Sequence, residues 1–140
     1  MNRVITLLLL FVLYSSTLPA QKSSLQLSIN SGEKIYTKKC AVCHSKNGQG
    51  KGKRIPPLVN SDYLMNNQEA SIRGILFGQN EEIIVNGQRY NRKMKAVKLS
   101  DVEIANVMNY IQNSWGNTNL TPVTKAQVMF IRQEYSKDLN

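Results

Sequence analysis

Cys40-Ala41-Val42-Cys43-His44 is the stretch of sequence that decides the fold, because it matches the C-x-x-C-H pattern of covalent haem attachment. On a helix, positions i, i+3 and i+4 lie on one face, so Cys40, Cys43 and His44 would point toward one planar partner. The two thiols can form thioethers with the haem vinyl groups, and the imidazole can bind the iron. We therefore predict one covalent haem c, bound by these three residues.

Three other interpretations of the same residues are weaker. A structural zinc site needs four ligands, whereas the chain contains two Cys and one His in total. A thioredoxin-like redox pair expects a βαβ context, and no apolar strand precedes the motif. A plain disulfide between Cys40 and Cys43 would give no role to His44. Haem attachment is the interpretation that uses all three side chains.

The beginning of the chain has the three parts of a secretory signal. Arg3 supplies positive charge, residues 4–13 are apolar apart from Thr6, and Pro19-Ala20 precedes a plausible cleavage point. A membrane-spanning helix needs about 20 apolar residues, and this run is much shorter. We expect residues 1–20 to be removed as a signal peptide. The mature protein would then lie in the periplasm, without stable membrane insertion.

Composition and charge describe one small basic domain. The chain of 140 residues carries 18 Lys and Arg against 9 Asp and Glu, a formal net charge of +9. It has only three Phe and one Trp, so a buried haem would add much apolar surface to the core. The positive charge suggests an acidic protein or an anionic membrane surface as partner. Nucleic acid, which many basic proteins bind, is not expected for an exported haem domain.

Helical signals dominate the mature sequence. Residues 21–30 are polar and predict a short lead-in, and a helical pattern begins at Ser31 and continues into the haem motif. Ser100 followed by Glu103 predicts a capping box, with an apolar stripe behind it and Gly116 closing the helix. Three further helices are expected, the first capped by Ser61, the second by Asn67 with Gly78 as its stop, and the tail helix by Thr124.

One short β-hairpin interrupts the helices. Residues 83–90 place branched apolar side chains before Asn86-Gly87, and this combination is a strong hairpin signal. Residues 45–54 are rich in Gly and Lys, which indicates a loop. The following Pro56-Pro57 is extended, because proline disfavours the α region for the residue before it. The predicted organisation is therefore mostly helical with one small hairpin.

A second iron ligand has to be sought among the methionines, because the single His excludes bis-His ligation within a monomer. Four of the five methionines have simpler assignments in the signal segment, in predicted helices or in the tail: Met1, Met65, Met108 and Met129. Packing is the ordinary use of Met in such places. Met94 differs, because it lies in a loop between Lys93 and Lys95. We predict that Met94 is the sixth ligand.

Taken together, residues 32–116 resemble a class I, mono-haem cytochrome c. The likeness rests on the haem motif, on Gly32 and Tyr36 ahead of it, on the proline segment, and on Tyr110 in the helix after Ser100. The chain is similar to bacterial cytochrome modules that serve copper nitrite reductases and terminal oxidases. The resemblance implies an all-α class I cytochrome c fold, with helices wrapped around one covalent haem c and a small β-hairpin insertion.

The resemblance also implies domain limits and roles for individual residues. The cytochrome domain would cover 31–117, followed by a tail helix within 118–140. Pro56 matches the proline whose carbonyl orients the proximal His, and Met94 matches the family's axial Met. Lys95 departs from the pattern, since many members carry proline there. Candidate donors to the haem propionates are Arg54, Arg89, Tyr90 and Trp115.

The predicted function is that of a periplasmic one-electron carrier with a six-coordinate His/Met haem c, and not that of an enzyme. One alternative is a tightly bound cytochrome subunit of a larger oxidoreductase. Another is a haem-based gas sensor, in which Met94 would be displaced by the gas. A peroxidase-like enzyme is disfavoured, because the chain has no second His for acid–base chemistry at the distal side.

A basic surface is predicted around the haem edge. Residues 45–60 and 85–100 contain no Asp or Glu and would form the two loops that frame the haem. They hold nine basic residues: Lys46, Lys51, Lys53, Arg54, Arg89, Arg92, Lys93, Lys95 and Lys98. We expect this surface to attract redox protein partners with acidic docking surfaces.

Overall fold

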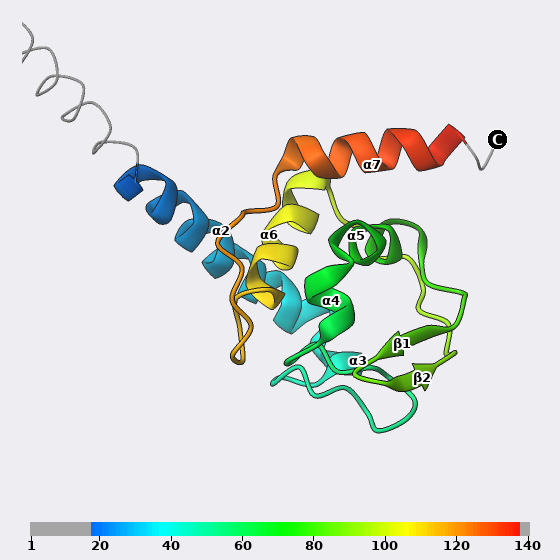
Figure 1. The fold of residues 1–140 in the computed structure, drawn as a ribbon. Helices are drawn as coiled ribbons and strands as arrows, with labels where there is room; N and C mark the ends of the chain where they lie inside the picture. Colours follow the sequence, from blue (N-terminus) through cyan, green and yellow to red (C-terminus); the bar gives the residue numbers. More distant parts are fainter. Residues whose placement is uncertain (1–17, 138–140) are drawn as a thin grey trace, which may run out of the picture.

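The computed structural model describes residues 18–137, which form a helical domain with one small hairpin (Figure 1). The helices are α2 (Leu18–Lys39), α3 (Ala41–His44), α4 (Asp62–Asn66), α5 (Gln68–Phe77), α6 (Asp101–Ile111) and α7 (Lys125–Lys137); the strands are β1 (Ile83–Val85) and β2 (Gln88–Tyr90). The predicted helical class and the hairpin are confirmed. Most of the predicted signal peptide 1–20 lies outside the described residues. None of the described helices is both long and apolar enough to cross a membrane.

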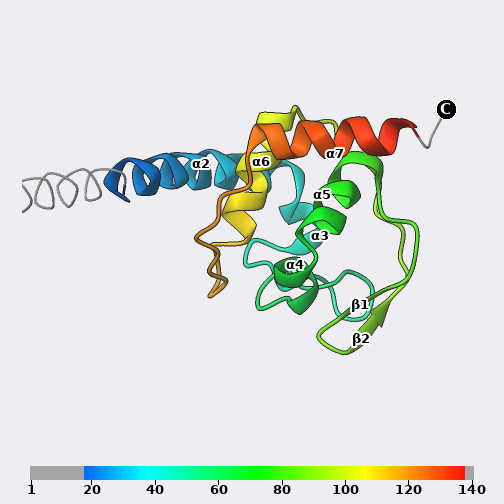
Figure 2. The ribbon, with the colours of Figure 1, turned by 45° about the horizontal axis from the view of Figure 1, so that its top comes forward.

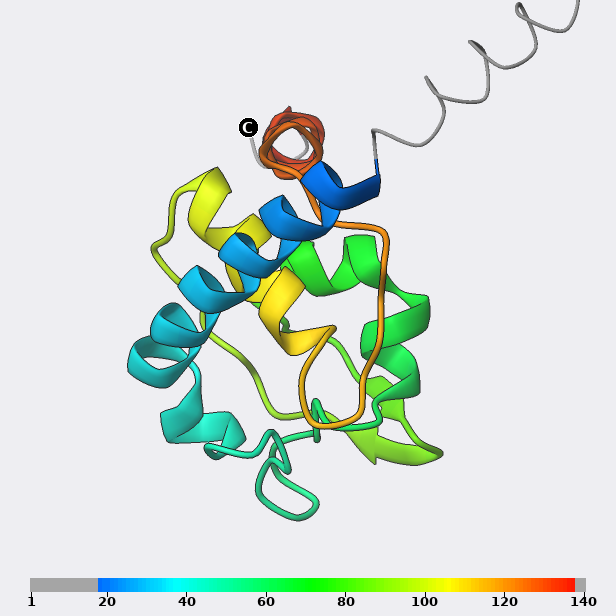
Figure 3. The same ribbon diagram turned by 90° about the vertical axis from the view of Figure 1, so that its left-hand side faces the viewer.

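Two helices far apart in the sequence, α2 and α6, cross each other closely (Figure 3). A Cβ on Gly32 of α2 would lie only 2.0 Å from the carbonyl oxygen of Asn106 on α6, so only glycine permits this approach. One turn further along α2, Tyr36 is 1% exposed, and its ring lies 5.4 Å from that of Tyr110 on α6. The crossing therefore fixes the end of α2, from which the haem motif continues.

Helix α2 begins earlier than the sequence predicted. Residues 21–30, predicted as a polar lead-in, are helical and continue directly into the helical segment expected from Ser31. Ser28 explains part of the difference, because its hydroxyl donates to Asn106 Oδ1 at 2.7 Å and accepts from Asn109 Nδ2 at 2.9 Å. Polar residues that resembled a lead-in thus belong to a longer helix, which is fastened to α6 by side-chain hydrogen bonds.

The capping box of α6 is present as predicted. Glu103 Oε2 accepts from the Ser100 backbone N–H at 2.8 Å, and Ser100 Oγ accepts from the Glu103 backbone N–H at 3.4 Å. The apolar stripe behind the box is buried in the core: Ile104, Ala105, Val107, Met108 and Ile111. The start of α6 was predictable because both halves of its cap lie within one turn of sequence.

The end of α6 lies at Ile111, before the predicted stop at Gly116. Ser114 Oγ donates to the carbonyl of Tyr110 at 2.7 Å, and a side chain that bonds a helix carbonyl competes with the next backbone N–H. Trp115 then takes a φ of 56°, which is uncommon for a residue with a side chain. The chain has therefore already left the helix when it reaches the glycine.

Two of the three caps expected for the other helices are present. Ser61 Oγ accepts from Leu64 N at the start of α4, and Thr124 Oγ1 accepts from Gln127 N at the start of α7, both at 3.1 Å. Asn67 precedes α5 as predicted, but its side chain makes no cap. Because α5 follows α4 directly, Asn67 also ends α4, and its side-chain amide donates back to a carbonyl of that helix.

Helix α7, the predicted tail helix, packs over α5 and α6 (Figure 2). Val128 and Ile131 are 0% and 3% exposed and belong to the same core as α5 and α6. Arg132 Nε also donates to Asp101 Oδ1 at 2.7 Å, which joins α7 to the first turn of α6. The tail helix therefore completes the core of the domain.

Replacing Ile131 with Ala tests this role of α7. The change should lower the free energy of unfolding of the haem-loaded protein by about 2–5 kcal/mol, because it leaves a cavity in a closed core. Urea unfolding followed by circular dichroism measures the difference. Met129→Ala is the control, because Met129 is on the same helix but 42% exposed, and it should change stability by less than about 0.5 kcal/mol. Equal effects of the two changes would contradict a core role for α7.

Candidate functional site

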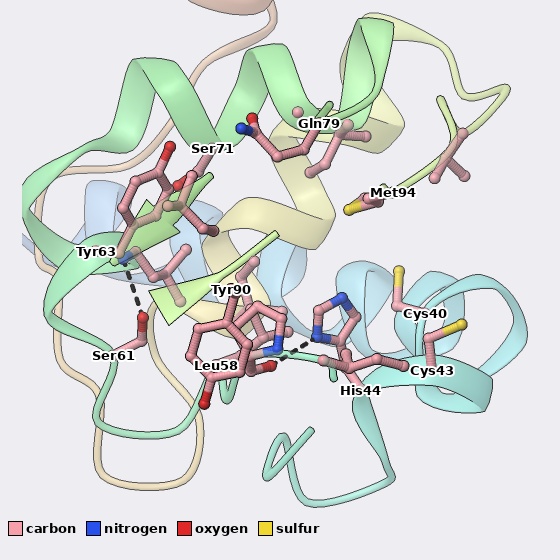
Figure 4. Close-up of a pocket in the computed structure, with 18 of the residues that line it drawn as sticks. Cys40, Cys43, His44, Leu58, Ser61, Tyr63, Ser71, Gln79, Tyr90 and Met94 are labelled. Carbon is pink, nitrogen blue, oxygen red and sulfur yellow. Dashed lines mark hydrogen bonds between the residues drawn. The ribbon is translucent and has the colours of Figure 1, made fainter. Parts of the chain in front are cut away.

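A cavity of about 600 Å³ lies between the haem motif, α5, α6, the hairpin and the loop that carries Met94 (Figure 4). Pockets for small molecules and cofactors usually measure about 300–1,000 Å³. Much of the wall is apolar and includes Leu58, Leu64, Ile75, Val85, Val107 and Met108. The cavity therefore suits a large, mostly apolar group.

The haem motif forms a short helical turn at the edge of this cavity. Cys40 lies at the joint between α2 and α3, and its carbonyl accepts from Cys43 N at 3.0 Å and from His44 N at 2.9 Å. The turn brings all three predicted side chains to the cavity, as their spacing requires. Cys40 and Cys43 are not joined in a disulfide. The motif therefore presents two thiols and one imidazole to a single space.

The imidazole of His44 is held in one orientation by a backbone carbonyl. Its Nδ1 lies 3.2 Å from the carbonyl oxygen of Pro56, which can only accept, so Nδ1 carries the proton. Figure 4 shows the other ring nitrogen directed into the cavity. Burial lowers the pKa of His44, and the hydrogen bond to Pro56 offsets this only in part. The ring is therefore neutral at pH 7, which is the form that binds a metal ion.

Met94 lies across the cavity from His44 (Figure 4). Of the other described methionines, Met108 also lines the cavity, but it is 0% exposed within the core stripe of α6. Met65 is half-buried on α4 and does not line the cavity, and Met129 is 42% exposed. The structure thus leaves two methionines beside the cavity, and Met94 is the one on a loop facing the imidazole.

The Met94 loop is paired with the chain that leaves α5. Gln79 N donates to the Met94 carbonyl at 2.9 Å, and Met94 N donates to the Gln79 carbonyl at 2.8 Å. A third bond runs from Val97 N to the carbonyl of Ile75 at 2.9 Å. These contacts were not apparent from sequence, because backbone pairing between distant residues leaves no signal in their side chains.

The candidate propionate partners divide into two pairs. Arg54 and Tyr90 line the cavity, whereas Arg89 and Trp115 do not. Arg89 pairs with Glu82 at 2.6 Å, and Trp115 packs among aromatic rings of α2 and α6. Three further polar residues of the cavity wall were not predicted as site residues from the sequence: Ser61, Tyr63 and Gln79. Ser61 and Tyr63 come from the start of α4 and Gln79 from the segment after α5, so only the tertiary fold brings them to one cavity.

The properties of the thiols do not favour the other interpretations of the motif. Burial raises the pKa of the Cys40 thiol to about 11, and the nearby Cys43 adds to the rise. The attacking thiol of a thioredoxin-like pair has a lowered pKa instead. Across residues 18–137, no three His, Cys, Asp or Glu side chains gather as a metal-ion site, as structural zinc would require.

Comparisons with known proteins agree with the fold and the motif. A family model described as Cytochrome c matches residues 29–115. A cytochrome c-552 of Thermus thermophilus is 36% identical over 117 residues, covering 77% of this chain and 78% of the relative. The cytochrome c subunit of quinone alcohol dehydrogenase from Gluconobacter oxydans is 27% identical over 105 residues, covering 74% of this chain and 22% of that subunit. The chain belongs to the cytochrome c family of electron-transfer proteins, whose cofactor is covalently bound haem c with its iron.

Proposed function

We propose that this protein is a one-electron carrier in which His44 and Met94 hold the iron of a haem c attached to Cys40 and Cys43. The observation that carries the proposal is the position of His44 and Met94 on opposite sides of one apolar cavity (Figure 4). When bound, the haem iron supplies a reversible change of one electron. His/Met ligation gives such iron a higher reduction potential than more electron-rich ligand sets do.

The protein's own residues would do three things for that iron. Pro56 keeps the His44 ring in the tautomer whose free nitrogen faces the cavity. The apolar wall excludes water, while Arg54 and Tyr90 offer hydrogen bonds to the carboxylates of the haem. His44 and Met94 together would leave no coordination position for a substrate. This is why we propose electron transfer and not catalysis.

We propose the periplasm as the place of action, on the basis of the signal-like sequence of residues 1–20. A tightly bound subunit of a larger oxidoreductase is a second candidate. It is favoured by the similarity to cytochrome c subunits of quinone alcohol dehydrogenases, of which this chain covers 22%. A shuttle would be purified free of its partners at physiological salt, whereas a subunit would remain with them.

The nine basic residues of the two loops give the proposed carrier a docking surface. All nine are exposed in the structure. Two of them have local partners, since Arg89 pairs with Glu82 at 2.6 Å and Lys51 Nζ donates to the Val42 carbonyl at 2.8 Å. The other seven are the stronger candidates for contact with an acidic redox partner: Lys46, Lys53, Arg54, Arg92, Lys93, Lys95 and Lys98.

Replacing both Cys40 and Cys43 with Ala tests covalent attachment. In the native protein the haem should remain with the chain in acidified organic solvent, because two thioethers hold it. In the double variant the haem should extract completely, and the yield of folded protein should fall. Absorption spectra of the solvent and protein fractions measure the outcome. Release of haem from the native protein under the same conditions would show that the attachment is not covalent.

Replacing Met94 with Ala tests the sixth ligand. The change should abolish the weak red absorption band of Met-to-ferric-iron ligation and lower the reduction potential, because a thioether ligand is lost. It should also open a position for carbon monoxide in the reduced protein, whereas the native spectrum should not respond to the gas. Met108→Leu is the matched control, because it keeps the packing volume beside the same cavity and should retain the band. If Met94→Ala kept the band, another residue would be the ligand. A native protein that bound carbon monoxide would support the gas-sensor alternative.

Electron-transfer rates at different ionic strengths test the docking surface. With an acidic redox protein, the bimolecular rate constant should fall at least about tenfold between about 0.01 M and 0.15 M salt, because screening weakens electrostatic steering. Lys53→Ala and Lys93→Ala should each lower the rate at low salt. Lys125→Ala on α7 is the control, since Lys125 is also exposed but lies outside the two basic segments 45–60 and 85–100. A rate constant that does not change with salt concentration, or equal effects of the three substitutions on the rate constant, would contradict the proposed surface.

A further inference from the structure

Gly78 ends α5 at a point where two stretches of backbone touch. Its φ is 90°, a conformation that side chains disfavour. A Cβ on Gly78 would lie 2.7 Å from the carbonyl oxygen of Met94 and 3.2 Å from the backbone nitrogen of Ala96. Both neighbours are backbone atoms, so no side chain could turn away to relieve the contact. The end of α5 therefore fits against the Met94 loop only because residue 78 has no side chain.

Hydrogen bonds lie on both sides of this close contact. Gln79, the next residue, exchanges two backbone hydrogen bonds with Met94, of 2.9 and 2.8 Å. On the other side, Val97 N donates to the carbonyl of Ile75, which lies in the last turn of α5 and has no acceptor role inside the helix. The loop is thus held by three backbone bonds around the glycine.

The far end of the segment between Gln79 and Met94 is also anchored. The hairpin turn meets the start of α4 through Asn86 and Asp62, and the backbone N–H of each donates to the side-chain oxygen of the other, at 2.7 and 3.0 Å. Val85 at the end of β1 is 1% exposed, which fixes the hairpin against the core. Hydrogen bonds therefore hold residues 79–94 at both ends, at the Gln79–Met94 pair and at the hairpin turn, so this segment forms an ordered side of the cavity.

We infer that Gly78 is a positioning residue for Met94: by lacking a side chain it lets the α5 end and the ligand loop pair, and so holds the Met94 sulfur opposite His44. The inference rests on the proposed role of Met94 as sixth ligand and adds a residue that does not line the cavity. A ligand loop that is ordered in advance loses little freedom when it binds. External ligands then compete poorly for the same coordination position.

Gly78→Ala in the full, haem-loaded protein tests the inference. The added Cβ would clash with the backbone of the Met94 loop, and Ala disfavours the φ of 90° that residue 78 adopts. The Met-to-ferric-iron band should therefore weaken or disappear. The affinity of the ferric protein for imidazole should rise at least about tenfold, because the Met94-bound state loses population. Gly52→Ala is the matched control. Gly52 has a φ of 53°, but a Cβ added there would have nothing within 4 Å, so this variant carries the conformational cost without the contact. It should keep the native band and the native imidazole affinity.

The outcomes separate this inference from the proposed function. If Met94→Ala loses the band while Gly78→Ala keeps the native band and imidazole affinity, Met94 is the ligand and the positioning role is wrong. If Met94→Ala keeps the band, the ligand assignment itself fails. If Gly78→Ala does not accumulate with attached haem, amide hydrogen exchange in the reduced native protein tests whether the Gln79–Met94 pairing holds the loop. The Gln79 and Met94 amides should exchange at least about a hundredfold more slowly than in an unstructured peptide, because their pairing must open first. Exchange at the peptide rate would overturn the inference.

Discussion

The close crossing of α2 and α6 at Gly32 is the contact on which the rest of the structure depends. The missing side chain allows α2 to lie against the Asn106 carbonyl, and this places Tyr36 in the core one turn later. Tyr36 in turn donates its hydroxyl to the Ser45 carbonyl at 2.6 Å, directly after the haem motif. A single backbone approach therefore determines where both ends of the motif lie, and with them the position of His44 at the cavity.

In the loop after the motif, a glycine again permits a close backbone contact, and this contact brings Pro56 back to His44. Gly50 takes a φ of 68°, and a Cβ there would lie 2.2 Å from the carbonyl oxygen of Ile55. The ring of Trp115 covers the neighbouring Gly48, where a Cβ would meet it at 2.5 Å. Trp115 thus contributes to the site from outside the cavity, because it closes the loop that presents the Pro56 carbonyl.

The sequence predicted best those features whose causes lie within a few residues of one another. The capping box at Ser100, the hairpin at Asn86-Gly87 and the joint placement of the haem motif are of this kind, because each depends on local geometry. The early start of α2 could not be predicted in the same way, since Ser28 bonds to α6 some 80 positions away. The cavity-lining position of Tyr63 was equally hidden, because it depends on how α4 packs against the hairpin.

The two proposed iron ligands illustrate this difference within one site. His44 comes from the same turn as the cysteines, so a short motif is enough to present it, and one carbonyl orients its ring. Met94 has no such local support, because its neighbours along the chain are exposed lysines. Its backbone is held instead by pairing with Gln79, on the other side of the hairpin. The sequence signals only the turn of this hairpin and not the pairing of Gln79 with Met94. A methionine in a polar loop can therefore be recognised as unusual from sequence, but the structure is needed to explain why that loop is ordered. The Met94 side of the cavity depends on long-range backbone contacts, so a change at Gly78, at the end of α5, can reach Met94 although Gly78 does not line the cavity.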